Sequence, residues 1–284
     1  MTNSSKQFVM IGLPATGKTS FLAALWYLVQ HAQVERRLKV ENLEGDIKYL
    51  NQIADLWLTF EVVPRTTTSS ERTVSMVLKD TATNMTFTLT VPDLSGESFV
   101  LQLVGRHFTV SFDKLLQGSS GAILFISPLN YRKPVRINRA TPLIQEMEPV
   151  APEGDAEDNS LISWDPAQTP TQVQLVELSQ FIAERDYFKP PFRLALIVSA
   201  WDQLKGENTT PAKWLEDELP LLAQFLESNR RLFEYTLYGV SAQGGDYNET
   251  DTLTRMTPSE RIQIVGAELK NSHDLTEPLT WLMR

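Results

Sequence analysis

Short apolar runs that end at turn-forming residues predict the strands of a central sheet. The first run is Phe8–Ile11, which breaks at Gly12, and similar runs follow at Ala122–Ile126 and Leu194–Val198. Unbroken apolar runs of this length are typical of parallel strands with both faces buried. We expect all three to be buried strands, with the first at the centre of the sheet.

Alternating apolar and polar positions predict a second kind of strand. Thr73–Leu78 alternates, and Met85–Val91 alternates again after the turn-forming residues Asp80–Asn84. This spacing predicts a β-hairpin with one buried face. A further run, Phe233–Val240, is expected to be the last strand of the chain.

Apolar residues at helical spacing predict the helices. A helix that follows the first strand places these residues on one stripe: Phe21, Leu22, Leu25, Trp26, Leu28 and Val29. A second is expected to begin at Pro211, with Thr210 as its N-cap, and to bend at Pro220. A third turns Val173, Val176, Phe181 and Ile182 inward, and a closing helix ends at Leu279–Leu282. The helical tryptophans are expected to lie in the core or on a partner surface; they are Trp26, Trp57, Trp214 and Trp281.

The composition narrows the class of ligand. The chain has 284 residues, of which 42% are hydrophobic, so it can bury a full core. Its formal net charge of -9 argues against general nucleic-acid or membrane-surface binding, because both partners are anionic. Small anionic ligands must therefore be held by local donors.

Neither a secretory signal nor a membrane span is expected. Residues 1–6 are polar, and no apolar stretch reaches the roughly 20 residues that a bilayer crossing needs. There is no cysteine, and the three histidines are scattered, so no disulfide or zinc cluster is predicted. We expect a soluble, cytoplasmic protein with one domain over residues 1–284 and an acidic, proline-containing insertion at 130–171.

A phosphate-binding motif lies between the first strand and the first helix. Gly12-Leu13-Pro14-Ala15-Thr16-Gly17-Lys18-Thr19 fits the Walker A pattern, in which backbone N–H groups surround phosphate oxygens at a helix N-terminus. Gly12 permits the sharp exit from the strand, and Gly17 permits a close approach of the backbone to phosphate. The strand before the motif and the amphipathic helix after it are the context that this mechanism requires.

Side chains of this region are suited to a nucleoside triphosphate with Mg²⁺. Lys18 is expected to reach the β- and γ-phosphates, Thr19 to ligate Mg²⁺ through its hydroxyl, and Ser20 to lie near the α-phosphate. Asp93 follows the second hairpin strand and is positioned to hold Mg²⁺ through a water molecule. Gly96 would then offer its N–H to the γ-phosphate.

The order of these features resembles the small, Ras-like G domains of the TRAFAC class of GTPases. Walker A, a threonine-bearing loop, a β-hairpin, Asp-x-x-Gly and a buried strand follow one another along the chain. The resemblance implies an α/β P-loop NTPase fold with a mixed, mostly parallel sheet and helices on both faces. More narrowly, Pro64-Arg65-Thr66 taken with Pro278–Leu282 is similar to the double-GTPase families of bacterial conflict systems.

Two later motifs extend the resemblance to guanine recognition. Ser199-Ala200-Trp201-Asp202 stands where the family usually has Asn-Lys-x-Asp, and Ser241-Ala242-Gln243 is similar to its Ser-Ala-Lys loop. The resemblance implies that Asp202 accepts hydrogen bonds from guanine N1 and N2, and that Ala242 donates its backbone N–H to the guanine oxygen. Without the family's lysine, guanine preference rests on Asp202, with Trp201 or Gln243 covering the ring. The alternative role for Asp202 is a helix N-cap.

The loops between these motifs bear on hydrolysis. Glu97 stands where many Ras-like proteins have a glutamine that orients the attacking water, and its carboxylate would face the γ-phosphate and slow the reaction. Thr66, Thr67 or Thr68 is expected to complete the Mg²⁺ shell. Arg65 stands three residues before Thr68, the spacing of the arginine finger of heterotrimeric G-protein α subunits. The alternative for Glu97 is a surface glutamate at the start of a helix. The alternative for Arg65 is a solvated arginine in a loop.

We therefore predict a Mg²⁺-dependent switch that binds GTP and GDP and hydrolyses GTP, slowly unless an effector or regulatory protein assists. Lys18, Glu97 and Arg65 are the candidate catalytic residues, and Thr19 and Asp93 the candidate metal ligands. One alternative is a scaffold that holds GTP with negligible turnover. Another is a P-loop kinase with a small acceptor, which leaves the hairpin and the Ser-Ala loop without a role.

Overall fold

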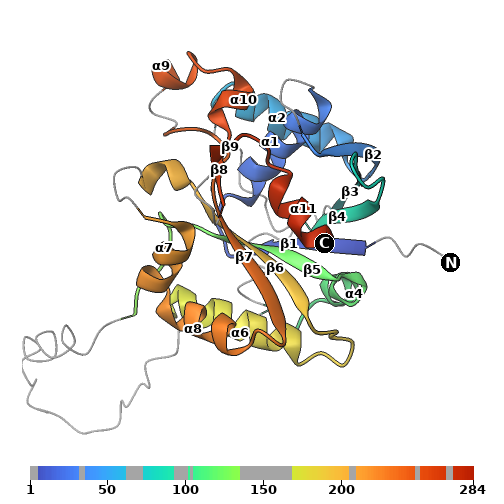
Figure 1. Ribbon diagram of the computed structural model, residues 1–284, viewed down its shortest axis with the longest axis vertical. Coiled ribbons are helices and arrows are strands. Elements are labelled where there is room, and N and C mark those ends of the chain that lie inside the picture. The colour runs from blue at the N-terminus through green and yellow to red at the C-terminus, as the bar shows by residue number, and fades with distance from the viewer. Residues whose placement is uncertain are drawn as a thin grey trace, which may run out of the picture.

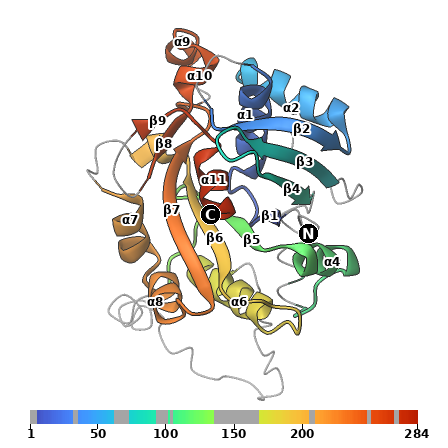
Figure 2. The ribbon, with the colours of Figure 1, turned by 45° about the vertical axis from the view of Figure 1, so that its right-hand side comes forward.

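The computed structural model describes residues 6–31, 36–61, 73–92, 102, 105–134, 168–204, 209–246, 250–266 and 271–284. Nine strands in these ranges form one sheet in the order β2-β3-β4-β1-β5-β6-β7-β8-β9 (Figures 1 and 2). The strands are β1 Lys6–Gly12, β2 Leu38–Glu44, β3 Thr73–Asp80, β4 Thr86–Pro92, β5 Gly121–Ile126, β6 Phe192–Ser199, β7 Phe233–Ser241, β8 Gln263–Val265 and β9 Asn271–Ser272.

The centre of the sheet is parallel and its two sides are antiparallel. β1 lies between β4 and β5 and is parallel to both, and the parallel pairing continues through β6 to β7. β3 and β4 form the predicted antiparallel hairpin, with Val74 opposite Val91. The predicted mixed sheet with a central first strand is confirmed. Because the parallel strands share one direction, their carboxyl ends meet at one edge.

Helices cover both faces of the sheet, as predicted (Figures 1 and 2). They are α1 Lys18–Gln30, α2 Ile47–Leu58, α4 Val110–Gly118, α6 Thr171–Ala183, η2 Trp201–Leu204, α7 Pro211–Glu218, α8 Pro220–Ser228, α9 Thr250–Leu253, α10 Pro258–Arg261 and α11 Glu277–Met283. One face packs on α1, α2 and α11, and the other on α4, α6, α7 and α8. None of the helices in the described ranges has the length and hydropathy that a bilayer crossing requires.

The helix predicted to begin at Pro211 is two helices. Thr210 caps α7 as predicted, because its hydroxyl accepts a hydrogen bond from the Lys213 amide at 3.0 Å. The expected bend at Pro220 is instead a break, since α7 ends at Glu218 and α8 begins with Pro220 in its first turn. Proline lacks the N–H that a continuing helix needs but suits the first helical position.

Other sequence expectations are corrected by the structure. Val173, predicted to face inward from α6, is 37% exposed, whereas Val176 and Ile182 are buried. The strand at Phe233 is not the last, because β8 and β9 follow it. The elements β2 and α4 were not predicted, and α2 was predicted only in placing Trp57 in a helix.

The predicted insertion leaves and rejoins the fold at one place. The backbone N–H of Arg132 donates to the Thr171 hydroxyl at 2.9 Å, and the Thr171 N–H donates to the Arg132 carbonyl at 3.0 Å. Residues 135–167 lie outside the described ranges. A single domain over residues 1–284 with an insertion at 130–171 remains a prediction.

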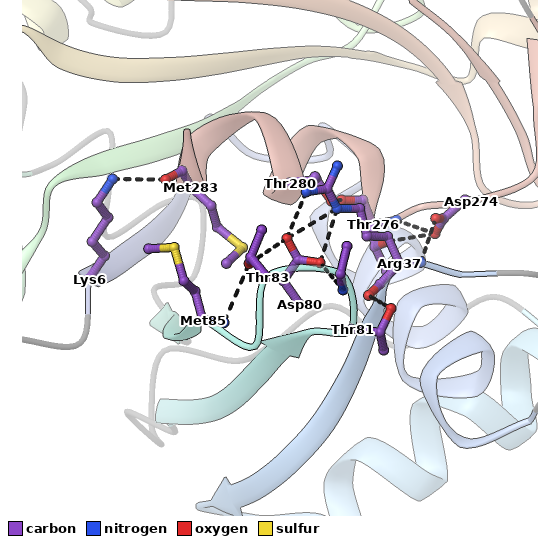
Figure 3. Close-up of polar contacts among 11 residues, drawn as sticks. Lys6, Arg37, Asp80, Thr81, Thr83, Met85, Asp274, Thr276, Thr280 and Met283 are labelled. Carbon is purple, nitrogen blue, oxygen red and sulfur yellow. Dashed lines mark hydrogen bonds and ion pairs between the residues drawn. The ribbon is translucent and has the colours of Figure 1, made fainter. Parts of the chain in front are cut away.

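A polar network fastens the C-terminal segment to the start of β1 and the end of β3 (Figure 3). Arg37 donates to both oxygens of Asp80, with an Nη2 to Oδ2 distance of 2.8 Å, and its backbone N–H donates to Asp274 at 3.2 Å. Thr83 also donates to Asp80, at 2.9 Å. Lys6 donates to the Met283 carbonyl of α11 at 2.8 Å. The Arg37 hydrogen bonds hold the pKa of the buried Asp80 carboxyl well below its usual range.

Replacing Asp80 with Asn should lower the free energy of unfolding by about 2 kcal/mol at pH 7, because it removes hydrogen bonds to a charged group. A carboxyl whose folded pKa is depressed stabilises the fold above its unfolded pKa of about 3.9 and loses that contribution at lower pH. The difference between wild type and Asp80→Asn should therefore shrink below about pH 4 in urea unfolding experiments.

Asp217→Asn is the matched control, since Asp217 forms an exposed ion pair with Lys213 on α7. It should change stability by less than about 0.5 kcal/mol. A difference for Asp80→Asn that stays constant from pH 7 to pH 3 would contradict the role of this carboxylate.

Candidate functional site

The turn between β1 and α1 is compressed against two neighbouring strands. A Cβ on Gly12, which has φ +153°, would lie 2.9 Å from the Phe125 carbonyl oxygen of β5. A Cβ on Gly17, with φ +82°, would lie 3.0 Å from the Ser199 Cβ of β6. Glycine is therefore required at both ends of the turn by backbone conformation and by close approach.

The middle of the turn holds the three other predicted residues of the motif. Pro14 is partly buried, Ala15 is exposed with φ +53°, and Thr16 is buried. The Thr16 hydroxyl donates to the Leu13 carbonyl at 2.8 Å, which closes the turn on itself. A positive φ at a non-glycine residue is strained and is found where a loop is held in a functional conformation.

The Lys18 ammonium group lies inside this turn. Its Nζ atom donates to the carbonyls of Gly12 and Leu13 at 2.8 and 2.7 Å, and it lies 3.4 Å from the Thr16 hydroxyl. Burial lowers the pKa of Lys18 from 10.5 to about 8. The turn therefore concentrates positive charge beside the N-terminus of α1, where the helix dipole also favours an anion.

A pocket of about 300 Å³ opens beside the turn at the carboxyl edge of the sheet. Its walls are the turn with the first residues of α1 and the residues at the ends of β5, β6 and β7. Predicted residues from distant parts of the chain meet here, namely Ala15, Gly17, Ser20, Asp202 and Ala242. Gly12, Lys18 and Thr19 belong to the same turn and the first turn of α1. The hydroxyl of Thr19 makes no hydrogen bond to another described residue.

Asp202 lines this pocket. It belongs to the short turn η2, directly after β6, and is 9% exposed. Its carboxylate accepts a hydrogen bond from Gln203 Nε2 at 2.7 Å. Asp202 lies within η2, so the alternative role of a helix N-cap is wrong.

Trp201 packs away from the pocket. A Cβ on Gly239 of β7 would lie 2.3 Å from the Trp201 ring, so the indole occupies the space that this glycine leaves. Trp201 is not among the lining residues, whereas its neighbours Ala200 and Asp202 are. Of the two residues predicted to cover a base, Gln243 alone lines the pocket in the described part of the chain.

The loop after β7 is held by buried hydrogen bonds. The Ser241 hydroxyl, in a residue 1% exposed, accepts from the Gly244 N–H at 3.0 Å. The Ala242 carbonyl accepts from Trp57 Nε1 of α2 at 3.0 Å. Both polar atoms of the Gln243 amide are buried without a hydrogen-bond partner in the described ranges. Buried amides are normally paired, and this one belongs to a residue that lines the pocket.

The structure brings together one part of the predicted site. The remaining predicted residues lie outside the described ranges: Arg65, Thr66, Thr68, Asp93, Gly96 and Glu97. Their roles remain predictions. Sequence reasoning did not predict Ser127, Leu129 and Asn130, which line the pocket after β5. Their position directly after a buried parallel strand was the available signal, because such strands end at the ligand-binding edge.

Comparison with protein families gives a match over nearly the whole chain. The model of the family described as Double-GTPase 1 matches residues 9–282 of the chain. No curated protein matches the chain in sequence.

Several solved structures are similar to the chain at low sequence identity. The putative nucleolar GTP-binding protein 1 of Plasmodium falciparum is 11% identical, with a TM-score of 0.34 over 89% of this chain and 86% of that one. The signal recognition particle receptor SRb-GTP/SRX complex from Chaetomium thermophilum is 13% identical, with a TM-score of 0.41 over 85% and 93%. Methanosarcina barkeri Roco2 RocCORdC bound to GDP is 8% identical, with a TM-score of 0.27 over 89% and 48%.

An anion bound in the turn should raise the pKa of Lys18 above its free value of about 8. Binding of sulfate, which has no titratable group in this range, should therefore take up a proton near pH 8.5 and little at pH 6.5, since Lys18 is already protonated there. Calorimetric titrations at pH 8.5 in buffers of different ionisation enthalpy should give different observed enthalpies. Lys18→Arg is the control, because a guanidinium stays charged throughout. A buffer-independent enthalpy for the wild type at pH 8.5 would contradict this assignment.

Proposed function

Because the chain belongs to the Double-GTPase 1 family, we propose that it binds GTP and GDP in the pocket beside Lys18 and hydrolyses GTP as a molecular switch. One observation carries this proposal. The same pocket is lined by Gly17 and Ser20 of the phosphate-binding turn and by Asp202 and Ala242 of the predicted base motifs. A nucleotide has its polyphosphate and its base at opposite ends, so this pocket suits both.

The phosphate end supplies charge and backbone donors. Lys18 would exchange its contacts with the Gly12 and Leu13 carbonyls for phosphate oxygens, at the N-terminus of α1. The free hydroxyl of Thr19, together with Asp93, would hold Mg²⁺, which supplies charge neutralisation to the phosphates when it is bound. Thr19 fits this role because its hydroxyl is not used by another described residue.

The residues proposed to contact the base have hydrogen-bonding groups complementary to those of guanine. The buried Asp202 carboxylate would accept hydrogen bonds from N1 and N2, and the Ala242 N–H would donate to the O6 atom. Adenine offers neither the N1 and N2 donors nor the oxygen, so it would leave the buried carboxylate without the two hydrogen bonds that guanine supplies, which is costly. Gln243 would cover the ring where the family pattern has lysine.

Hydrolysis would proceed by in-line attack of water on the γ-phosphate. Lys18 neutralises charge that develops on the phosphate oxygens, Arg65 would do the same in cis, and Glu97 would orient the water. One of Thr66, Thr67 and Thr68, together with Gly96, would contact the γ-phosphate and be released after its loss. The state of these loops would report the nucleotide to an effector or regulatory protein in the cytoplasm.

Asp202→Asn should exchange guanine preference for xanthine preference, because the new amide donates to the xanthine C2 oxygen instead of accepting from N2. Titration of labelled GDP and xanthosine diphosphate with Mg²⁺ should show GDP affinity falling about 100-fold, from the loss of two charged hydrogen bonds. Xanthosine diphosphate affinity should rise. The exposed variant Asp217→Asn should bind as the wild type does. If GDP, ADP and xanthosine diphosphate bind alike to the wild type, the proposed guanine site is wrong.

Arg65→Ala should lower the single-turnover rate of GTP hydrolysis by at least about 100-fold without weakening nucleotide binding. Arg230→Ala, in a turn far along the chain, is the control and should keep the wild-type rate. An unchanged rate in Arg65→Ala would discard the cis arginine. If the wild type releases no phosphate over hours, with and without candidate partners, the chain is a GTP-dependent scaffold instead of a hydrolase.

A further inference from the structure

We propose that Trp57, backed by Arg261, is a positioning residue for guanine recognition: it holds the loop that presents the Ala242 amide to the base. The inference rests on the proposed function and adds a determinant of specificity outside the pocket. Neither residue lines the pocket, and both come from elements that have no part in the Walker A or base motifs.

The contact between Trp57 and the loop is buried and direct. Trp57 lies in the last turn of α2, is 1% exposed, and donates from Nε1 to the Ala242 carbonyl at 3.0 Å. The ring itself is fixed against α1, with its centroid 5.3 Å from that of Tyr27. A buried carbonyl that lost this donor would be left without a compensating hydrogen bond, so the loop has one favoured position.

This hydrogen bond fixes the part of the loop that secondary structure leaves free. Ser241 is held by its pairing with Gln263 of β8, and the Gly244 N–H is held by the Ser241 hydroxyl at 3.0 Å. Between these points, the direction of the Ala242 N–H depends on two peptide planes. The Ala242 N–H lies in the peptide plane shared with the Ser241 carbonyl, and the Ala242 carbonyl lies in the next plane, so the two planes meet at the Ala242 Cα. The pairing of Ser241 with β8 holds the chain before Ala242 and the Trp57 hydrogen bond holds it after, so together they restrict rotation at Ala242.

Arg261 closes the arrangement from the opposite side. Its guanidinium carbon lies 4.2 Å from the centroid of the Trp57 ring and 4.6 Å from that of Phe60, and the residue is 1% exposed. Its Nη1 atom also donates to the Trp57 carbonyl at 3.4 Å. Gly244, with φ +92°, makes room for it, because a Cβ there would lie 2.8 Å from the Arg261 carbonyl oxygen. Such cation–π contacts are stronger when desolvated.

The inference predicts a loss that is confined to one atom of the base. Trp57→Phe keeps the ring and removes the N–H donor, so the Ala242 amide should contact guanine O6 less well. GDP affinity should fall about fivefold, which is the size of one neutral hydrogen bond. 6-Thioguanosine diphosphate keeps the N1–H and 2-amino donors but has a weakly accepting sulfur in place of O6, so its affinity should change less than about twofold.

Trp26→Phe is the matched control. Trp26 Nε1 donates to Asn51 Oδ1 at 2.9 Å, so this variant also removes a buried indole N–H between α1 and α2, without touching the loop. The readout is the affinity for GDP divided by the affinity for the second diphosphate. Trp26→Phe should leave this ratio at the wild-type value. Arg261→Met, which keeps apolar volume and removes the charge, should lower the ratio as Trp57→Phe does.

The inference is tested by calorimetric titration of each protein with both diphosphates. The melting temperature of each protein shows whether it is folded. A lowered ratio in Trp57→Phe and Arg261→Met, but not in Trp26→Phe, supports the inference. Equal loss for both ligands, or the same ratio in all three variants, overturns it. If Trp57→Phe does not unfold cooperatively, Arg261→Met decides alone by the same criterion. Absence of GDP binding by the wild type is a different result, which refutes the proposed function itself.

Discussion

The ammonium group of Lys18 is held within the turn that joins β1 to α1, and the candidate site is built around that turn. The chain has a net charge of -9, so a polyphosphate must be attracted by local groups, among them this ammonium and the backbone N–H groups around it. A buried ammonium is unfavourable without partners, and the carbonyls of Gly12 and Leu13 supply them. Those carbonyls converge because Gly12 and Gly17 adopt conformations that other residues rarely reach.

The sheet places the rest of the site around this turn. β1 is flanked by β4 and β5 in parallel register, and β5, β6 and β7 continue the parallel order. Their carboxyl ends therefore lie at one edge, and the segments that follow them form the walls of one pocket. Residues separated by more than two hundred positions, such as Ala15 and Ala242, meet there. The α/β layers position this edge and leave its chemistry to the loops.

Much of this arrangement could be predicted from local patterns. The buried strands, the hairpin and the Thr210 cap each have a signal within a few residues. The elements that were missed lack such a signal. β2 is a half-exposed, charged strand, and β8 and β9 have three and two residues, too few to show a period. The contact between Trp57 and Ala242 joins residues 185 positions apart. A proline at position 220 fits both a bent helix and the first turn of a new helix, and the structure has the new helix. Such features are determined by tertiary packing, which a local pattern does not contain.

Every proposed role of this site requires the Lys18 turn to bind the polyphosphate of a guanine nucleotide. Calorimetric titration of the wild type and of Lys18→Ala with GTP and Mg²⁺ tests it most directly, with circular dichroism to show that both proteins are folded. The account predicts that the wild type binds and that Lys18→Ala loses at least about 100-fold in affinity, as expected for a buried charge-assisted contact. Equal dissociation constants for the two folded proteins would contradict it.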